Sequence, residues 1–220
     1  MLPAHLYPIK PQNPPLPPGL SLYLCDLSTL PWDLDHCHSL LPPEPLSPRP
    51  PLRPIAHLRR LQTRALLYQL VGQQLGVPPQ QLTPAHGPDG KPTLPGLAFN
   101  SSHSGDWALL ALAPQGRLGV DLEIVRNRDN LHNITNACMT YREQLLWDKL
   151  TNREDIVAFY RIWTAKEAAL KAWGLGIDAL RRVELNDLQQ PTQAVLDQEH
   201  ACKVWMLQPS PALVAAVAVA

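Results

Sequence analysis

The chain has 220 residues, of which 45% are hydrophobic and 17% charged, and this composition is typical of a globular protein rather than a disordered one. Its 19 basic and 19 acidic side chains give a formal net charge of zero. Zero net charge excludes the broad positive surface expected of a protein that binds duplex nucleic acid, so an anionic partner must meet a local basic patch.

Proline dominates the first quarter of the chain, where 15 of the 25 prolines precede residue 55. Because proline fixes φ and lacks an amide donor, we expect neither regular helix nor central sheet in this arm, apart from a strand at residues 20–27 (LSLYLCDL). His36, Cys37 and His38 are metal-ligand types, but adjacent side chains point in different directions and no second ligand pair follows them. A loop is the favoured interpretation of this stretch.

An amphipathic helix is predicted over residues 55–76. Its apolar side chains recur at helical intervals, and the pattern ends at Gly76, just before Pro78 and Pro79. A turn-dense loop (HGPDGKPTLPG, residues 86–96) and a strand (WALLALA, residues 107–113) follow it.

The second half of the chain repeats this order of elements. We expect a strand at residues 118–125, two helices, and then strands near the C-terminus; the helices span 141–150 and 154–173, and the strands lie near 181–185, 203–207 and 212–220. These patterns predict an α+β fold, a pseudo-dimer of two similar halves, each a helix packed on a small antiparallel sheet. The N-terminal half is expected at residues 1–115 and the C-terminal half at residues 116–220.

The cysteines and the apolar C-terminal run bear on the cellular compartment of the protein and on whether it binds a membrane. The four cysteines form no CxxC pair and no apolar signal segment follows Met1, so a reducing cytoplasm is expected. The apolar run at residues 212–220 is far shorter than the ~20 residues of a membrane-spanning helix, and its branched side chains favour a buried strand. We therefore expect no membrane partner.

Two carboxylates stand out in the apolar strand LGVDLE, residues 118–123. Asp121 and Glu123 are two residues apart, so their side chains share one face of the strand. Adjacent carboxylates repel each other, and a hard cation that prefers oxygen ligands, such as Mg²⁺, would relieve the repulsion. The alternative is an exposed edge strand whose polar face happens to be acidic.

Glu167 and Lys171 in the last predicted helix are four residues apart and share a face, whereas Lys166 is turned by roughly 100°. Such a pair is often an ordinary surface pair worth roughly 0.2–0.5 kcal/mol. The neighbouring sequence favours a functional site over a surface pair, because FNSSHSGDW, with His103 between two serines, stands just before the acidic strand. A metal, a cation, an imidazole and hydroxyl donors together outline a diphosphate site.

Four stretches in this order resemble the 4′-phosphopantetheinyl transferases of the monomeric, surfactin-synthetase-activating (Sfp-like) type: GKP at 90–92, FNSSHS at 99–104, GVDLE at 119–123 and WTAKEAALK at 163–171. The helix with RRLQTRALL also looks like the family's early arginine-bearing helix, so the resemblance covers roughly residues 57–174. Any one motif is a weak signal, but four in order are a specific one.

The resemblance implies a role for each matching residue. Asp121, Glu123 and Glu167 would bind Mg²⁺ together with the diphosphate of coenzyme A, which Lys171 would contact. The remaining cofactor-binding residues implied are His103, Ser102, one arginine of the early helix (Arg59 or Arg60), and Lys91 with Pro92 beside the adenine.

The implied reaction modifies a serine of an apo acyl or peptidyl carrier protein. The hydroxyl attacks the β-phosphorus of coenzyme A and 3′,5′-ADP leaves. Glu167 would accept the serine proton, directly or through water, and Lys171 would offset charge on the leaving oxygen. The carrier would belong to fatty acid, polyketide or nonribosomal peptide synthesis, and the enzyme would be a monomer.

Two other classes of function remain open from the sequence. The first is a non-catalytic module of the same fold that binds carrier proteins, and the retained acidic residues and Lys171 argue against it. The second is an unrelated Mg²⁺-dependent phosphotransferase, but the chain has no GxxxxGK[ST] loop.

A docking surface for an acidic carrier is expected just after the acidic strand. The residues expected there are basic or apolar: Arg126, Arg128, Met139, Tyr141 and Arg142.

Overall fold

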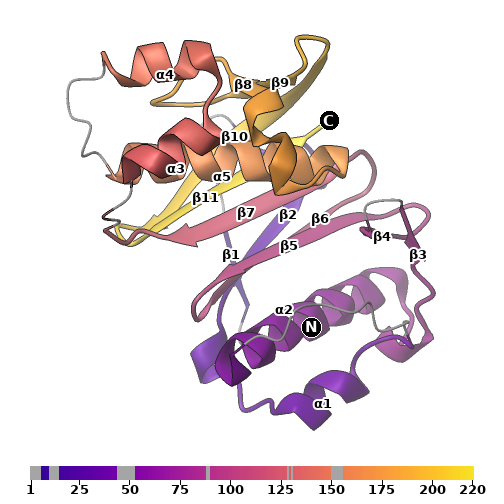
Figure 1. The fold of residues 1–220 in the computed structure, drawn as a ribbon. Coiled ribbons are helices and arrows are strands. Elements are labelled where there is room, and N and C mark those ends of the chain that lie inside the picture. The colour runs from indigo at the N-terminus through magenta and orange to yellow at the C-terminus, as the bar shows by residue number, and fades with distance from the viewer. Residues whose placement is uncertain are drawn as a thin grey trace. The chain divides into compact units, whose positions relative to one another are not determined.

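The structure is a computed structural model that describes residues 6–9, 15–43, 53–87, 90–127, 129, 131–149 and 156–220. The described residues form two compact units. The first contains residues 6–9 and 19–115, and the second contains residues 15–18 and 116–220 (Figure 1).

The first unit is built on a four-stranded antiparallel sheet in the order β1-β2-β6-β5. Its strands are β1 (Tyr7–Pro8), β2 (Ser21–Asp26), β5 (Ala98–Ser104) and β6 (Trp107–Ala113). The predicted strands at 20–27 and 107–113 are confirmed, whereas β5 was not predicted, because its serines and asparagine are poor strand formers. A two-residue turn joins β5 to β6, and Gly105 takes the positive φ (55°) that this turn needs.

Helix α2 (Pro54–Leu75) packs on β5 and β6 and confirms the predicted helix. Its last turn is closed by Gly76 in the left-handed conformation, whose N–H donates to the carbonyl of Gly72. Tyr68 of α2 lies 6.2 Å from Phe99 of β5 between ring centroids, and both are buried. The core of this unit therefore lies between α2 and one face of the sheet.

The expected loop at His36–His38 is wrong, since α1 (Leu34–Ser39) occupies it. Pro31 and Pro42 bracket a stretch without proline, and Asp33 caps the helix by accepting a hydrogen bond from the N–H of His36 at 2.8 Å. Cys37 is fully buried and packs in a small cluster with Leu61 and Ala65 of α2. A short helix can form here because the stretch contains no proline and has an N-cap.

Short elements complete the first unit. The predicted loop at 86–96 carries a two-residue ladder of β3 (Ala85–His86) and β4 (Pro92–Thr93). The single-turn helices η1 (Leu27–Thr29) and η2 (Pro79–Gln81) follow β2 and α2 respectively.

The second unit contains a five-stranded antiparallel sheet in the order β7-β11-β10-β9-β8. The strands are β7 (Leu118–Ile124), β8 (Val183–Leu185), β9 (Gln193–Leu196), β10 (His200–Ser210) and β11 (Leu213–Val219). Four of them confirm predicted strands, and only β9 was missed. Residues 15–18 belong to this unit, where the indole N–H of Trp205 donates to the carbonyl of Pro15 at 3.2 Å.

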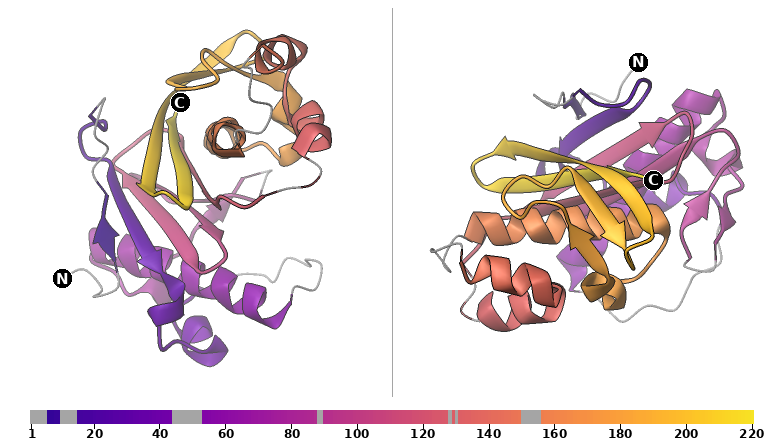
Figure 2. Two further views of the ribbon diagram at one scale, coloured as in Figure 1. Left: turned by 90° about the vertical axis from the view of Figure 1, so that its left-hand side faces the viewer. Right: turned by 90° about the horizontal axis from the view of Figure 1, so that it is seen from above.

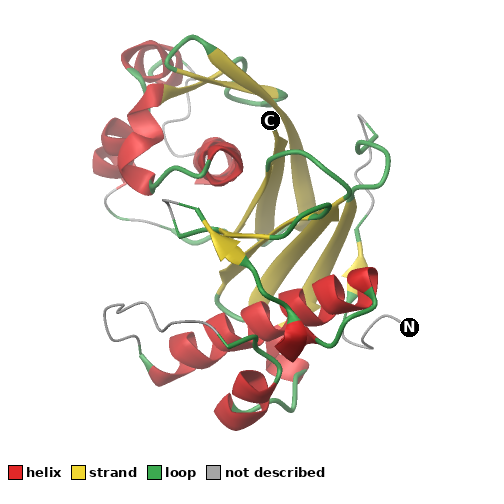
Figure 3. Ribbon diagram, turned by 90° about the vertical axis from the view of Figure 1, so that its right-hand side faces the viewer, coloured by secondary structure: helices red, strands yellow, loops and turns green. Residues whose placement is uncertain are grey.

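The helices of the second unit are α3 (Leu131–Cys138), α4 (Tyr141–Trp147), α5 (Ile156–Trp173) and η3 (Ile177–Arg182). Helix α5 packs on β7, β11 and β10, and α3 contacts it from another side. The left view of Figure 2 and Figure 3 show α5 end-on, with the sheet on one side and α3 and α4 on the other. The predicted helices at 141–150 and 154–173 are confirmed within the described residues, and α3 was not predicted.

Each unit thus has a long helix on an antiparallel sheet, and the predicted α+β class is confirmed. The pseudo-dimeric relation between the halves stays a prediction. Over the described residues, no helix combines the length and the apolarity needed to cross a membrane.

Candidate functional site

Gly119 shows which face of β7 meets α5. A Cβ at this glycine would lie 2.0 Å from the carbonyl oxygen of Ala168 and 2.4 Å from the amide nitrogen of Ala172, so the backbones of strand and helix nearly touch. Side chains alternate along a strand, and therefore Asp121 and Glu123 lie on the same face as Gly119, toward α5. Strand and helix together thus place these carboxylates along one side of the helix.

An ion pair joins β7 to α5. Lys171 Nζ donates to Asp121 Oδ1 at 2.7 Å, so the ammonium pairs across to the strand. Asp121 is only 4% exposed, and its second carboxylate oxygen, Oδ2, is buried. The interpretation of Asp121 as part of an exposed acidic face is therefore wrong, although β7 does lie at one edge of its sheet.

Glu167 is half-buried one turn before Lys171, and its environment favours the protonated form. The pKa of this carboxyl is raised from 4.5 to about 6: burial is the largest cause, the charges of Asp121 and Glu123 act in the same direction, and the ammonium of Lys171 opposes them. Three carboxylates and one ammonium therefore share one electrostatic site on the α5 face of β7.

The chemistry of these donors fits a hard divalent cation. All three acidic residues offer carboxylate oxygens, which Mg²⁺ prefers, and their mutual repulsion is what such a cation would relieve. Within the described ranges, no three His, Cys, Asp or Glu side chains stand in a geometry that would hold a metal ion. The ligand atoms of these three residues are of the kind that Mg²⁺ prefers. In this structure the cation paired with Asp121 is the ammonium of Lys171.

The predicted cofactor residues of β5 lie in the first unit. Phe99 packs against Tyr68 of α2, so alternation places Ser101 and His103 on the α2 face of the sheet. Ser102 lies on the opposite face and is buried. The polar motif therefore presents His103 and Ser102 to different sides of the strand.

The two candidate arginines of α2 differ in their partners. Arg59 donates from Nε to Asp106 Oδ1 at 2.7 Å, and from Nη1 to the carbonyl of Leu27 and to Gln62 Oε1, both at 2.9 Å. Arg60 Nη2 lies 3.2 Å from His57 Nδ1. Arg59 thus ties α2 to the β5–β6 turn, at the end of the hairpin that carries His103.

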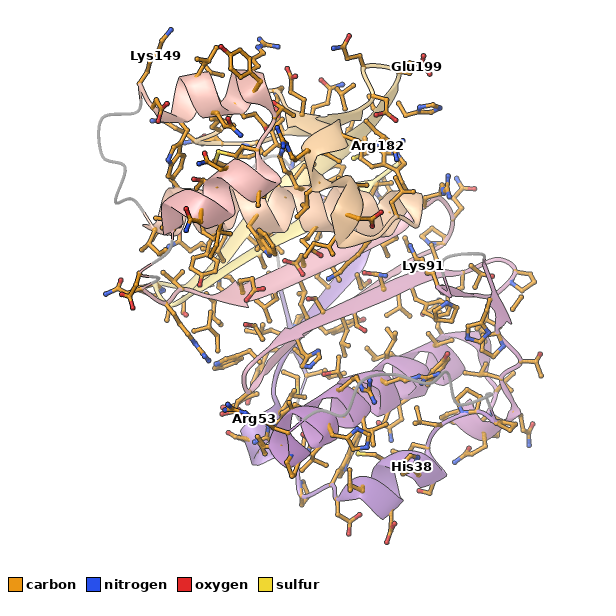
Figure 4. The ribbon with its side chains drawn as sticks, viewed as in Figure 1. His38, Arg53, Lys91, Lys149, Arg182 and Glu199 are labelled. Atoms are coloured by element: carbon orange, nitrogen blue, oxygen red, sulfur yellow. The ribbon has the colours of Figure 1, made fainter. Side chains whose placement is uncertain are left out.

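Lys91 and Pro92 lie at the β3–β4 ladder, where the carbonyl of Lys91 accepts the N–H of Gly87 at 3.1 Å. Figure 4 shows Lys91 beside this ladder in the first unit. The structure thus brings Asp121, Glu167 and Lys171 together with Glu123 in the second unit, and the remaining predicted residues lie in the first.

A cavity of about 470 Å³ in the first unit does not coincide with these residues. Leu97, Leu112 and Pro114 line it, so it opens where β5 begins and β6 ends, at the opposite end of the hairpin from His103. Residues from the end of α2 (Gln73 and Gln74) complete its wall.

Sequence reasoning missed a buried ion pair on another side of α5. Lys166 is fully buried and its ammonium pairs with Glu143 of α4. Burial lowers the pKa of Lys166, and the charge of Glu143 opposes that change. The signal was present, since Thr140 and Glu143 form the spacing of a capping box, and the 100° turn already separated Lys166 from Glu167.

The predicted carrier-docking surface is partly corrected. Met139 is completely buried, so its placement on this surface is wrong. Arg126 is exposed, and Arg128 lies outside the described residues. Arg142 pairs with Glu184 of β8 at 2.5 Å, while Tyr141 is 72% exposed.

Comparison with known proteins gives one consistent result. The family model described as "4′-phosphopantetheinyl transferase superfamily" matches residues 117–218. The chain is 37% identical over 172 residues to the 4′-phosphopantetheinyl transferase HetI of Nostoc sp., covering 74% of this chain and 72% of that protein. It is 32% identical over 166 residues to a putative 4′-phosphopantetheinyl transferase of Synechocystis sp., covering 73% and 68%. The 4′-phosphopantetheinyl transferase AcpT of Escherichia coli is 39% identical over 93 residues, covering 40% and 47%.

Proposed function

The chain belongs to the 4′-phosphopantetheinyl transferase superfamily, and from this premise we propose that it transfers the 4′-phosphopantetheine group of coenzyme A to a serine of an apo carrier protein. The products would be the holo carrier and 3′,5′-ADP. The observation that carries the proposal is the charged site on β7 and α5, where Asp121, Glu123 and Glu167 act on one another and Lys171 pairs with Asp121.

We propose Asp121, Glu123 and Glu167 as the residues that would hold Mg²⁺ with the diphosphate of coenzyme A. Their support is the oxygen-only donor set and the raised pKa of Glu167. A bound Mg²⁺ would supply neutralisation of the charge on the diphosphate oxygens.

Lys171 and Glu167 are the proposed catalytic residues. Lys171 reaches the site from α5 and pairs there with a buried carboxylate, which suits it to contact the diphosphate. With a pKa of about 6, Glu167 is mostly ionised at neutral pH and is still a better base than an ordinary carboxylate. This pKa supports its proposed role of accepting the proton of the carrier serine, directly or through water.

Coenzyme A would also be held by residues of the first unit. His103 with Arg59 or Arg60 would bind its phosphates, Lys91 and Pro92 would flank the adenine, and the hydroxyl of Ser102 would donate a hydrogen bond to it. Arg59 already donates hydrogen bonds to Asp106, Leu27 and Gln62, whereas the one contact described for Arg60 is with His57. Arg60 is therefore the arginine that we favour for binding a phosphate.

The partner would be an acyl or peptidyl carrier protein, met by a surface near Arg126 and Tyr141, both exposed. We propose that the protein acts as a cytoplasmic monomer, without nucleic acid or membrane partners. The alternative, a non-catalytic carrier-binding module, is disfavoured because the similar proteins are named as transferases.

The proposed function is tested by mass spectrometry of apo carriers incubated with coenzyme A, with Mg²⁺ or with EDTA. We expect one phosphopantetheine per carrier with Mg²⁺ and none with EDTA. A panel of fatty acid, polyketide and peptide carriers compared by kcat/KM would identify the physiological class. If the protein bound carriers but modified none, the non-catalytic alternative would replace this proposal.

Asp121→Ala should lower kcat by more than ~100-fold, on the scale of lost electrostatic stabilisation at an active site. Glu199→Ala is the matched control, because Glu199 is an exposed acidic residue of the same unit (Figure 4), and we expect normal turnover from it. Near-normal turnover of Asp121→Ala in excess Mg²⁺ would contradict the metal assignment.

A further inference from the structure

A buried polar cluster fastens α3 and α4, here called the bridging helices, to α5. At its centre Lys166 of α5 is fully buried. Its ammonium donates to Glu143 Oε2, to the carbonyl of Cys138 at 2.9 Å and to the carbonyl of Leu180 at 3.3 Å. An ammonium has three donors, so these three acceptors satisfy it completely.

Glu143 connects the same cluster to the N-cap of α4 and to one further element, β8. Its Oε2 accepts the N–H of Thr140 at 2.8 Å, and its Oε1 accepts the N–H of Leu185 in β8 at 2.9 Å. The hydroxyl of Thr140 accepts the N–H of Glu143 in return, at 3.2 Å, which completes the capping box of α4. One carboxylate thus connects the start of α4, the middle of α5 and the strand β8.

The cluster and the acidic site lie on different sides of α5. Successive residues of a helix are separated by roughly 100°, so Lys166 stands almost opposite Ala168, which faces Gly119 of β7. Glu167 lies between these two directions. Helix α5 is therefore held between the sheet and the bridging helices, and this arrangement sets the direction of Glu167.

We propose that Lys166 and Glu143 are a positioning pair that fixes the rotation of α5, and with it the direction of Glu167 toward Asp121. The pair contacts neither substrate nor metal in this proposal and acts only through the helix. The inference rests on the proposed function solely for the role given to Glu167.

Lys166→Met is the test, with Val204→Ala as a destabilised control. Val204 belongs to the same core, is 1% exposed and takes part in none of the hydrogen bonds of the polar cluster described above. Both variants are assayed well below their thermal midpoints. We expect kcat of Lys166→Met to fall about 10- to 100-fold below that of Val204→Ala, because a small misplacement of a catalytic group has that effect. KM for coenzyme A should stay within about threefold of the wild type.

Equal kcat in the two variants would overturn the proposal, because a purely structural role affects activity only through stability. Should Lys166→Met not fold, Glu143→Gln takes its place, with the same pattern expected. Thr140→Ala removes a hydroxyl of the capping box but leaves the ion pair, and we expect its kcat within about twofold of the wild type.

Amide hydrogen exchange of the substrate-free, metal-free protein separates this inference from the proposed function. Lys166→Met should accelerate exchange in residues 141–147 and 163–171 beyond the effect of Val204→Ala. Unchanged exchange there would overturn the positioning role even if the wild type were active. If the wild type modified no carrier, the proposed function would fail, and the exchange result would still decide whether the pair holds the helix.

Discussion

Lys171 illustrates how a side chain that looks ordinary along the helix acquires its role from another element. Its helical neighbour at four residues is Glu167, but its ion pair crosses to Asp121 of β7. An exposed pair of this spacing contributes a few tenths of a kcal/mol at most. A lysine that neutralises a carboxylate with 4% exposure is different, since removing it would leave a buried charge without its cation.

At the residue scale, Glu167→Gln should change stability in a way that depends on pH. The pKa of Glu167 is raised to about 6 in the folded protein, so folding favours the protonated carboxyl. The contribution of Glu167 to stability is full below pH 4.5 and is lost as pH rises through about 6. In EDTA at pH 7.5 the glutamine variant should therefore have a midpoint higher by on the order of 2–4 °C.

Thermal unfolding of both proteins at pH 4, 5, 6 and 7.5 checks this expectation, and the difference should vanish at pH 4. Glu199→Gln, at an exposed position, controls for the general effect of removing a negative charge. A variant less stable than the wild type at pH 7.5 would contradict the repulsive environment assigned to Glu167.

At the scale of elements, the approach of α5 to β7 and β11 depends on small side chains. The helix presents Ala165, Ala168 and Ala172 to its core, and β11 presents Ala216 and Ala218 to the same core. With Gly119 opposite the helix backbone, these residues allow a separation that larger side chains would prevent. That short separation is what lets Lys171 reach Asp121.

Gly119→Ala should therefore destabilise the second unit by roughly 3 kcal/mol, at the upper end of overpacking effects, because the new methyl would meet backbone atoms that cannot rotate away. Gly76→Ala is the control, since its Cβ meets nothing within 4 Å and it suffers only from the left-handed φ of 69°, about 1–2 kcal/mol. Both changes restrict the unfolded chain equally, so the comparison cancels that effect. Urea unfolding that gave equal losses would contradict the close approach of helix and strand.

At the scale of the whole molecule, the four cysteines distribute evenly between the two units. Cys25 and Cys37 lie in the first unit, Cys138 and Cys202 in the second, and all four are buried. Burial raises the pKa of each thiol, to about 12 for Cys25 and Cys202 and about 11 for Cys37 and Cys138. Reactive thiolate is therefore scarce in the folded protein.

Native protein at pH 8 should show no fast-reacting thiol toward Ellman's reagent, while all four should react in guanidinium chloride. Glu199→Cys supplies a positive control, because an exposed thiol at that position should react at once. Stoichiometric fast labelling of any native cysteine, identified by peptide mapping, would contradict the burial of that cysteine.

The sequence by itself predicts the helices and strands whose apolar periodicity or end signals are clear. The helical spacing and terminal glycine of residues 55–76 identify α2, and the apolar runs identify β6, β7 and β11. The charged motif at Asp121, Glu123, Glu167 and Lys171 is also visible without a structure. These signals succeed because periodicity, capping and each short motif by itself depend on residues close to one another along the chain.

Only the tertiary structure decided which partners these residues have. It pairs Lys171 with Asp121, buries Lys166 against Glu143, places Met139 in the core, and sends Ser102 and His103 to opposite faces of β5, a strand that its polar composition concealed. Ion pairing and burial depend on elements that are distant in sequence, such as α4 and α5 or β7 and α5. No local pattern specifies which of these elements will meet, because the free energy that selects a partner comes from burying the whole interface between them.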